Sequence, residues 1–247
     1  MPAIPAWPPK SLPRLFVEAT LSDGAAVTLD GPQANYLGNV LRLGVGGQVL
    51  LFDGTSGEWI ATVAQMTRKS MQLTVERRTK AVEAVPDLWL AFAPVKRTQL
   101  DWLVEKATEL GVARLMPVVT RRTVVERIKG ERLRSIAVEA AEQCGRTILP
   151  VIDELVALER LLKDRDSGRM LYFADETGGE PMVTAFESGP GLILTGPEGG
   201  FTPEERELIR AAVGVKPISL GPRILRAETA ALAAVAGWMA FAGDWRS

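Results

Sequence analysis

The residue types most able to do chemistry gather in two stretches near the C-terminal end of the sequence. The first is TGPEGG, residues 195–200, which follows an apolar segment of strand length and precedes a helix start. Thr202 is a favourable N-cap, Pro203 suits the first helical position, and Glu205 would complete a capping box. This glycine-rich loop is therefore expected at the carboxyl end of a strand, where open α/β sheets bind ligands.

The composition of this loop limits what it can hold. Glycines let a ligand approach the backbone closely, although two adjacent glycines can equally form a tight turn that needs positive φ. The loop matches neither GxGxxG nor GxxxxGK(S/T), which argues against a dinucleotide or a nucleoside triphosphate. Glu198 would also repel a phosphate in a partly dehydrated pocket. A ligand without phosphate fits better.

The second stretch is SLGPRILRAETAALAAVAGWMAFAG, in which a Gly-Pro turn leads to the start of a long apolar helix. Four polar residues crowd that start: Arg223, Arg226, Glu228 and Thr229. The 15 residues between Glu228 and Asp244 carry no charge. Such a helix must be buried, either in the core or against another subunit. The polar cluster predicts a site, and ordinary capping with a surface ion pair is the alternative.

The absence of histidine excludes several kinds of catalytic and metal site. With none in 247 residues, the chain has no Ser-His-Asp triad, no Cys-His pair and no imidazole zinc site. Cys144 is the only cysteine, so intramolecular disulfides and thiolate metal cages are excluded as well. Its place in an apolar helical pattern predicts that it is buried. The remaining chemistry belongs to carboxylates, Lys, Arg, hydroxyls and backbone amides, and we expect no metal.

Nothing in the sequence indicates a membrane or an export signal. No run reaches the ~18 apolar residues of a membrane span, and MPAIPAWPPK lacks the charged and apolar regions of a signal peptide. Hydrophobic residues make up 47% of the chain and charged residues 24%, which is typical of globular proteins. We expect a reducing, cytoplasmic location and no membrane partner.

The hydrophobic pattern changes near residue 84 and predicts two domains. Residues 1–83 show short apolar runs separated by Gly, Asp and Ser, with one or two helical turns in PQANYLGNVLRL, and predict a small β-barrel. Residues 84–247 alternate strands and helices, which predicts an α/β domain with a parallel sheet. The strands are expected at residues 88–94, 114–120, 170–175, 191–196 and 216–221.

Charge is divided unevenly along the chain. Residues 1–146 carry 19 Lys and Arg against 15 Asp and Glu, a net of +4, whereas residues 147–247 carry 10 against 15, a net of −5. The asymmetry suggests an anionic partner for the N-terminal side. Solvated faces without a partner are the alternative.

TGPEGGFTPEE followed by LGPRILRAETAAL closely resembles the C-terminal signature of the ribosomal RNA small subunit methyltransferase E family, knotted methyltransferases of the SPOUT class. Further similar segments are KRTQLDWLVEKATELGV, VVTRRTVV, AEQCGRTILP, PRLFVE and YLGNVLRLGVGGQVLLFDG. The resemblance extends from Pro13 to about Gly243. Tyr36 departs from the family, which often has histidine there, so no role is carried over to this position.

The resemblance implies methylation of N3 of a uridine in small-subunit (16S) ribosomal RNA, free or in the assembled subunit, by a homodimer that uses S-adenosylmethionine. It also implies a C-terminal domain with a trefoil knot and a PUA-like N-terminal barrel that binds RNA. The cofactor residues implied are Thr195, Gly196, Pro197, Glu198, Gly199, Gly200, Leu220, Gly221, Ile224, Leu225 and Thr229. Together with the basic segment 96–146, it suggests RNA contacts at Arg14, Arg42, Lys96, Arg97, Arg122 and Arg146.

The chemistry of uracil then suggests roles for the polar cluster at the helix start. N3 carries a weakly acidic proton that must leave, and without histidine a carboxylate or a cation must help. Arg226 is expected to stabilise the developing negative charge, and Glu228 either to accept the proton or to orient Arg226 by an ion pair. Two other functions stay open, because a family resemblance does not specify the target base: methylation of a different RNA, and RNA binding without catalysis.

Overall fold

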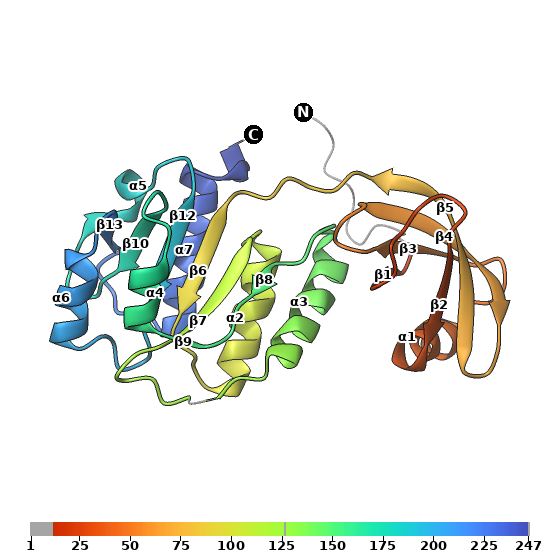
Figure 1. Ribbon diagram of the computed structural model, residues 1–247, viewed down its shortest axis with the longest axis horizontal. Helices are drawn as coiled ribbons and strands as arrows, with labels where there is room; N and C mark the ends of the chain where they lie inside the picture. The colour runs from red at the N-terminus through yellow and green to blue at the C-terminus, as the bar shows by residue number, and fades with distance from the viewer. Residues whose placement is uncertain (1–11, 126, 247) are drawn as a thin grey trace. The chain divides into compact units, whose positions relative to one another are not determined.

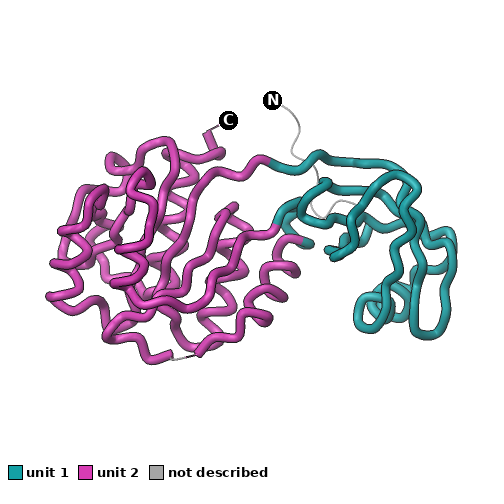
Figure 2. Tube along the Cα trace, viewed as in Figure 1, with its two compact units in different colours: residues 1–83, 142–148 teal, residues 84–141, 149–247 magenta. Residues whose placement is uncertain are grey.

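The computed structural model describes residues 12–125 and 127–246 and divides into two compact units (Figures 1 and 2). Unit 1 comprises residues 1–83 and 142–148, and unit 2 comprises residues 84–141 and 149–247. Reciprocal hydrogen bonds join segment 142–148 to the end of the first stretch: Thr147 N–H donates to Glu83 Oε1 (3.0 Å), and Glu83 N–H donates to Thr147 Oγ1 (2.8 Å). None of the helices described is long and apolar enough to cross a membrane.

Unit 1 contains a five-stranded sheet with the strand order β1-β3-β4-β5-β2. The strands are β1 (Arg14–Phe16), β2 (Ala26–Asp30), β3 (Gln48–Phe52), β4 (Glu58–Met66) and β5 (Ser70–Lys80). Neighbours are antiparallel except β1 and β3. Side chains alternate between buried and exposed along β2 and the first half of β5, because successive residues of a strand point to opposite faces. The buried ones, including Leu51 and Leu73, form one core.

A helical segment follows β2, where the sequence predicted one or two turns. It consists of α1 (Gly31–Asn35) and a π-helical turn (Tyr36–Val40). Leu37 is fully buried, whereas Tyr36 is exposed. Arg42 comes next with a φ of 57° and is the one non-glycine residue with positive φ in the described part of the chain. Such strained backbone and π-helical turns are most frequent at functional sites, which makes this turn a candidate.

Unit 2 is a parallel sheet with helices on both faces. Its strands are β6 (Leu88–Phe92), β7 (Arg114–Val119), β8 (Val151–Ile152), β9 (Val156–Ala157), β10 (Met170–Ala174), β11 (Glu180–Pro181), β12 (Gly191–Thr195) and β13 (Val215–Ser219). Its helices are α2 (Arg97–Glu109), α3 (Gly130–Cys144, whose last turn belongs to unit 1), α4 (Leu158–Asp164), α5 (Met182–Ala185), α6 (Pro203–Ala211) and α7 (Ala227–Phe241), followed by a 3-10 turn (Asp244–Arg246). The strand order is β11-β13-β10-β12-β6-β7-β8, and β9 pairs with β7.

The two faces of this sheet build separate cores. Leu90 and Ile193 pack with residues of α2, α3, α5 and α7, whereas Leu171 and Leu194 pack with residues of α4 and α6. All four side chains are fully buried. Continuous apolar strands such as GLILT are typical of a parallel sheet that is covered on both faces. The predicted α/β class is therefore confirmed.

The strand order brings two distant loops together at the carboxyl edge of the sheet. β13 pairs with β10 on the side away from β12, so the chain crosses β10 after leaving β12. It then returns through residues 220–226 to α7, which contacts α2, β6 and β12. The trefoil knot implied by the resemblance stays a prediction.

Helix α7 is buried along most of its surface, as its lack of charge predicted, but one stripe is accessible. Ala231, Val235 and Trp238 belong to the core of unit 2. The exposed or half-buried stripe consists of Thr229, Ala233, Ala236 and Ala240.

Cys144 is exposed, which corrects the expectation that it is buried. It ends α3, and the helix leaves the core of unit 2 after the fully buried Ala141. Residues 142–148 belong to unit 1. The apolar spacing of α3 therefore extends to Cys144, although the helix packs against the core of unit 2 only as far as Ala141.

Candidate active site at the carboxyl edge of the parallel sheet

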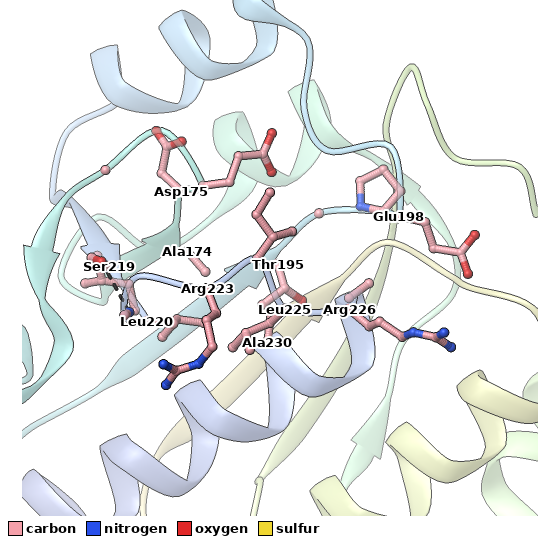
Figure 3. A pocket seen from close by; sticks show the side chains of 18 of the residues that line it. Ala174, Asp175, Thr195, Glu198, Ser219, Leu220, Arg223, Leu225, Arg226 and Ala230 are labelled. Atoms are coloured by element: carbon pink, nitrogen blue, oxygen red, sulfur yellow. Dashed lines mark hydrogen bonds between the residues drawn. The ribbon is translucent and has the colours of Figure 1, made fainter.

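Three loops that follow β10, β12 and β13 line a pocket of ≈ 590 Å³ in unit 2 (Figure 3). The lining comes from residues 174–178, 195–198 and 218–226, together with Ala227 and Ala230 of α7 and with Lys96 and Gln99 at the start of α2. Small-molecule sites commonly have volumes of about 300–1,000 Å³. The pocket therefore has the size of a ligand site.

The glycine-rich loop is packed tightly against the core. Thr195 is buried, and its carbonyl accepts a hydrogen bond from Ala93 N–H at 3.1 Å. A Cβ on Gly196 would lie 2.7 Å from the ring of Phe201, which is itself buried. Gly200 has a φ of 66°, and its N–H donates to the Pro197 carbonyl at 2.9 Å. The loop is thus a tight turn and also one wall of the pocket.

The start of α6 forms the capping box that the sequence predicted. Glu205 N–H donates to Thr202 Oγ1 at 3.3 Å, Thr202 N–H donates to Glu205 Oε2 at 2.9 Å, and a proline occupies the first turn. Glu205 is only 3% exposed, and its second oxygen, Oε1, accepts a hydrogen bond from Arg121 N–H at 2.7 Å. The carboxylate therefore fixes the helix start on two sides.

The loop at residues 220–226 is open by comparison. Gly221 has a φ of 109°, and no atom lies within 4 Å of the place where a Cβ would be. Ile224 is 95% exposed, although its side chain is apolar. Arg223 and Arg226 extend in different directions (Figure 3). Here glycine is required by the backbone conformation and not by a close neighbour.

The loop after β10 is held by buried charge. The Asp175 side chain has no exposed surface, receives a hydrogen bond from Thr177 N–H at 2.9 Å and pairs with Arg210 at 2.7 Å. Burial by itself raises the pKa of Asp175, but the hydrogen bonds from Thr177 and Arg210 outweigh it and hold the pKa below its ordinary value. Glu176 pairs with Arg206 of α6. Among residues 12–125 and 127–246, no three His, Cys, Asp or Glu side chains gather as a metal site.

The structure brings most of the predicted cofactor residues together. Those that line the pocket are Thr195, Gly196, Pro197, Glu198, Leu220, Gly221, Ile224 and Leu225. Those outside the lining are Gly199, Gly200 and Thr229.

The two residues with predicted catalytic roles are placed differently. Arg226 lines the pocket. Glu228 lies outside the lining, is 7% exposed, and has an Oε2 atom without a hydrogen-bond partner among the described residues. Within the part of the chain that the structure describes, no ion pair joins Glu228 to Arg226. One expected role of Glu228, the orientation of Arg226 by an ion pair, is therefore not observed.

Sequence reasoning missed the wall formed by residues 174–178. A signal was available, because the expected strand MLYFAD runs directly into ETGG and so places carboxylates and glycines at a strand end. The same rule that identified residues 195–200 would have identified this loop. Lys96 was assigned to RNA alone, whereas its side chain also lines the pocket.

The predicted RNA contacts are divided between exposed and buried side chains. Arg42, Lys96, Arg97 and Arg122 are exposed. Arg122 Nη1 also donates a hydrogen bond to the Gly199 carbonyl at 2.7 Å, which ties this arginine to the glycine-rich loop.

Arg14 and Arg146 are instead buried in unit 1. Arg14 Nε pairs with the buried Glu58 carboxylate at 2.5 Å, and its guanidinium donates to the Arg146 carbonyl. Arg146 is 5% exposed and lies 3.4 Å from a carboxylate oxygen of Glu83. Buried and paired guanidinium groups are not accessible to phosphates, which corrects the expectation that these two residues contact RNA.

Two protein families match most of the chain. The RNA methyltransferase domain matches residues 83–239, and the RNA methyltransferase PUA domain matches residues 29–76. Ribosomal RNA small subunit methyltransferase E of Rickettsia conorii is 32% identical over 228 residues, which cover 90% of this chain and 93% of that protein. The Synechocystis protein of the same name is 34% identical over 232 residues, which cover 91% and 74% of the two chains.

Solved structures with similar folds contain a methyl donor. Ribosomal RNA small subunit methyltransferase E from Neisseria gonorrhoeae, bound to S-adenosyl methionine, superposes with a TM-score of 0.86 at 28% identity and covers 95% of this chain and 100% of that chain. A Legionella pneumophila methyltransferase in complex with SAM has the same TM-score and identity, with coverage of 95% and 99%.

Proposed function

The chain belongs to the ribosomal RNA small subunit methyltransferase E family and methylates ribosomal RNA with S-adenosylmethionine, and we propose that the methylated atom is N3 of one uridine in small-subunit (16S) RNA. The substrate is that RNA, free or in the assembled small subunit, and the protein works in the cytoplasm, where the subunit is made. The observation that carries the proposal is the pocket of ≈ 590 Å³ formed by the loops after β10, β12 and β13, with Arg226 in its lining.

The pocket lining fits S-adenosylmethionine, which has an adenine, a ribose and a cationic sulfonium but no phosphate. Leu220 and Leu225 supply apolar surface, and the space beside Gly221 is open. Glu198 also lies in the lining, where its charge attracts a cation, whereas the charge of Glu176 is paired with Arg206. When bound, the cofactor supplies an electrophilic methyl group. We expect binding that needs no metal, so calorimetric titration should give the same affinity with and without a chelator.

Arg226 is proposed to stabilise the uracil anion. Methyl transfer is an in-line displacement, so positioning of the target nitrogen supplies much of the rate. Loss of the N3 proton leaves negative charge on the ring, and a fixed cation beside the ring stabilises that charge in the transition state. Arg226 begins α7 as its N-cap residue, so its backbone is fixed by a long buried helix.

Glu198 replaces Glu228 as the proposed proton acceptor. The Glu198 carboxylate and the Arg226 guanidinium extend toward the same side of the pocket (Figure 3). Glu228 is buried outside the lining, and a general base must come within hydrogen-bond reach of the proton that it removes. Glu198→Gln should therefore slow methyl transfer, whereas Glu228→Gln should keep the rate of the unaltered enzyme.

RNA binding is proposed for the exposed cations of both units. Arg42 lies on the strained turn of unit 1, and Lys96, Arg97 and Arg122 lie around the pocket in unit 2. Cationic side chains neutralise phosphates and release counterions, so their loss weakens binding and its salt dependence together.

A homodimer is proposed through α7. The accessible stripe of Thr229, Ala233, Ala236 and Ala240 is small and uncharged, and Phe241 at the helix end is 43% exposed. Light scattering should give a dimer mass, and Ala240→Glu should give a monomer with an unchanged melting temperature. Ala234 has no exposed surface, so a charge there would disrupt the fold instead of the interface.

The proposed target is tested by mapping modified nucleosides in 16S RNA. RNA from a strain that lacks this gene should miss one 3-methyluridine, and the unaltered gene should restore it. Complementation with Arg226→Ala should leave the position unmethylated. A missing methyl group on another atom or in another RNA would overturn the assignment of the target.

A further inference from the structure

Glu205 makes a contact that helix capping does not require. Its Oε2 accepts the Thr202 N–H within the capping box, and its Oε1 accepts the N–H of Arg121, 84 positions earlier in the chain, at 2.7 Å. With 3% exposure, this carboxylate is one of the few buried charges of unit 2. Hydrogen bonds between backbone N–H groups and a carboxylate are short and strong. Glu205 therefore joins the loop after β7 to the start of α6.

The loop after β7 has a fixed backbone at residues 120–123. Thr120 N–H donates to Thr123 Oγ1 at 2.9 Å, and Thr123 N–H donates to the Thr120 carbonyl at 3.1 Å. Thr120 is buried, whereas Arg121 and Arg122 are exposed. The turn thus anchors two adjacent cationic side chains whose outer parts face solvent.

Arg122 lies directly on the glycine-rich loop. Its Nη1 donates to the Gly199 carbonyl at 2.7 Å, and a Cβ on Gly199 would meet Arg122 Cβ and Cδ at 3.5 Å. The pKa of Glu204 lies below its ordinary value. Hydrogen bonds from the Glu204 backbone N–H and from Thr202 are the main causes, and the charges of Arg121 and Arg122 come next. Both cations therefore lie near the first turn of α6, next to the wall of the cofactor pocket.

We propose that Glu205 is a positioning residue for RNA: it fixes the backbone of Arg121 so that Arg121 and Arg122 receive a phosphate of the strand that carries the methylated nucleotide. The inference rests on the proposed function, because the pocket beside Gly199 must be the place of methyl transfer. An arginine whose backbone is already fixed loses less conformational freedom when it binds a phosphate than one on a mobile loop does.

Glu205→Gln is the informative substitution because its side chain has the same shape. Glutamine has one carbonyl oxygen, so it cannot accept both the Thr202 and the Arg121 N–H groups, and its amide nitrogen would face a donor. Thr202→Ala is the matched control for helix capping, since it removes the hydroxyl that accepts from Glu205 N–H and leaves the Glu205 carboxylate in place. Glu207→Gln makes the same change of charge at an exposed position of α6.

The experiment measures binding of a 16S RNA transcript to the full chain at several salt concentrations, with S-adenosylmethionine affinity and melting temperature for each variant. Glu205→Gln should weaken RNA binding about tenfold and lower the log–log salt slope by roughly 0.7–1.8, which corresponds to one or two phosphate contacts. Its cofactor affinity should stay within about threefold of the unaltered enzyme. Thr202→Ala should lower the melting temperature but keep the RNA affinity and slope, and Glu207→Gln should change neither.

A normal salt slope for Glu205→Gln would overturn the proposal. So would a loss of RNA affinity that is equal in Thr202→Ala and Glu205→Gln, because capping alone would then explain it. A double variant, Arg121→Ala with Arg122→Ala, keeps Glu205 intact and must reproduce the reduced slope if these cations meet phosphates. Failure of the proposed function is seen separately, as an unaltered enzyme that neither binds the cofactor nor methylates 16S RNA.

Discussion

Two of the glycine-containing walls of the pocket are built in opposite ways. In residues 195–200, Gly196 packs against the buried ring of Phe201, so glycine is needed at this position because the neighbouring atoms leave no room. Residues 220–226 have open space around Gly221 and a nearly fully exposed Ile224, so glycine is needed there because φ is 109°.

This difference indicates how the site is prepared for its ligand. The packed wall is preorganised, since the core and the hydrogen bonds within unit 2 already stabilise its conformation before a ligand binds. The open wall has apolar side chains that gain burial only when something covers them. Substitutions in the first wall should therefore reduce stability and function together, whereas those in the second should reduce function alone.

The largest effect is expected for Arg226→Ala in the open wall. Removal of the cation proposed to stabilise the uracil anion should slow methyl transfer by about 10²-fold or more. The melting temperature should stay unchanged because Arg226 is exposed. The measurement is single-turnover methylation with saturating RNA and cofactor.

Arg223→Ala is the matched control for this prediction. Arg223 belongs to the same loop and also lines the pocket, but its side chain extends in a different direction (Figure 3). It should keep a rate within about threefold of the unaltered enzyme, since its charge is not beside the reacting ring. Equal losses of rate in both variants would mean that the rate depends on the total positive charge of the loop and not on Arg226 specifically.

The second prediction compares the two kinds of glycine. Gly196→Ala places a Cβ against Phe201, so it should cost about 1–3 kcal/mol of stability by overpacking and weaken cofactor binding about tenfold. Gly221→Ala meets no atom but disfavours the positive φ. It should weaken binding by a similar factor with little change in melting temperature, because the open loop has few contacts to lose. Calorimetric titration and thermal melts check both, and a large drop in melting temperature for Gly221→Ala would contradict the comparison.

Sequence reasoning predicted the packed wall better than its surroundings. The strand, the glycine turn, Thr202 and Glu205 are consecutive in the chain, so local rules of strand ends and helix caps locate them. The α/β class followed from strand and helix periodicity for the same reason. Contacts between distant segments have no such local signal, which is why Arg121 at Glu205 was not foreseen.

The sequence did not predict which charged side chains are buried. Arg14 and Arg146 are arginines in a basic half of the chain, and composition cannot tell that Glu58 and Glu83 lie beside them. Glu228 has the spacing of a site residue, but the helical rotation at the start of α7 places it outside the pocket lining. In each case the three-dimensional arrangement, and not the residue type, decides whether the charge can meet a ligand.

The third prediction tests the buried charge that holds the loop after β10. The folded-state pKa of Asp175 lies below its ordinary value of 3.8, so its ionised form stabilises the fold above that pH. This contribution is lost as the pH falls through the lower, folded-state pKa. Asp175→Asn should lower stability near pH 7 by about 1.5–3 kcal/mol for a lost charged hydrogen bond. The difference from the unaltered enzyme should shrink as the pH falls below about 4 in acid melts, and a difference that stays constant well below that pH would contradict it.

The smallest effect, and the most direct test of the open wall, is expected for Ile224→Ala. Because Ile224 is 95% exposed, its truncation should change stability by less than about 0.5 kcal/mol. Ile193→Ala makes the same substitution in β12, directly before the packed wall, where the side chain is fully buried, and should cost about 2–5 kcal/mol. If the open loop folds over the cofactor, Ile224→Ala should still weaken cofactor binding about fivefold, since burial of even part of such a side chain contributes about 1 kcal/mol. Thermal melts and calorimetric titration measure the two quantities in the same samples. A stability loss for Ile224→Ala that approaches that of Ile193→Ala would mean that residues 220–226 are already packed without a ligand, and the contrast between the two walls would then be wrong.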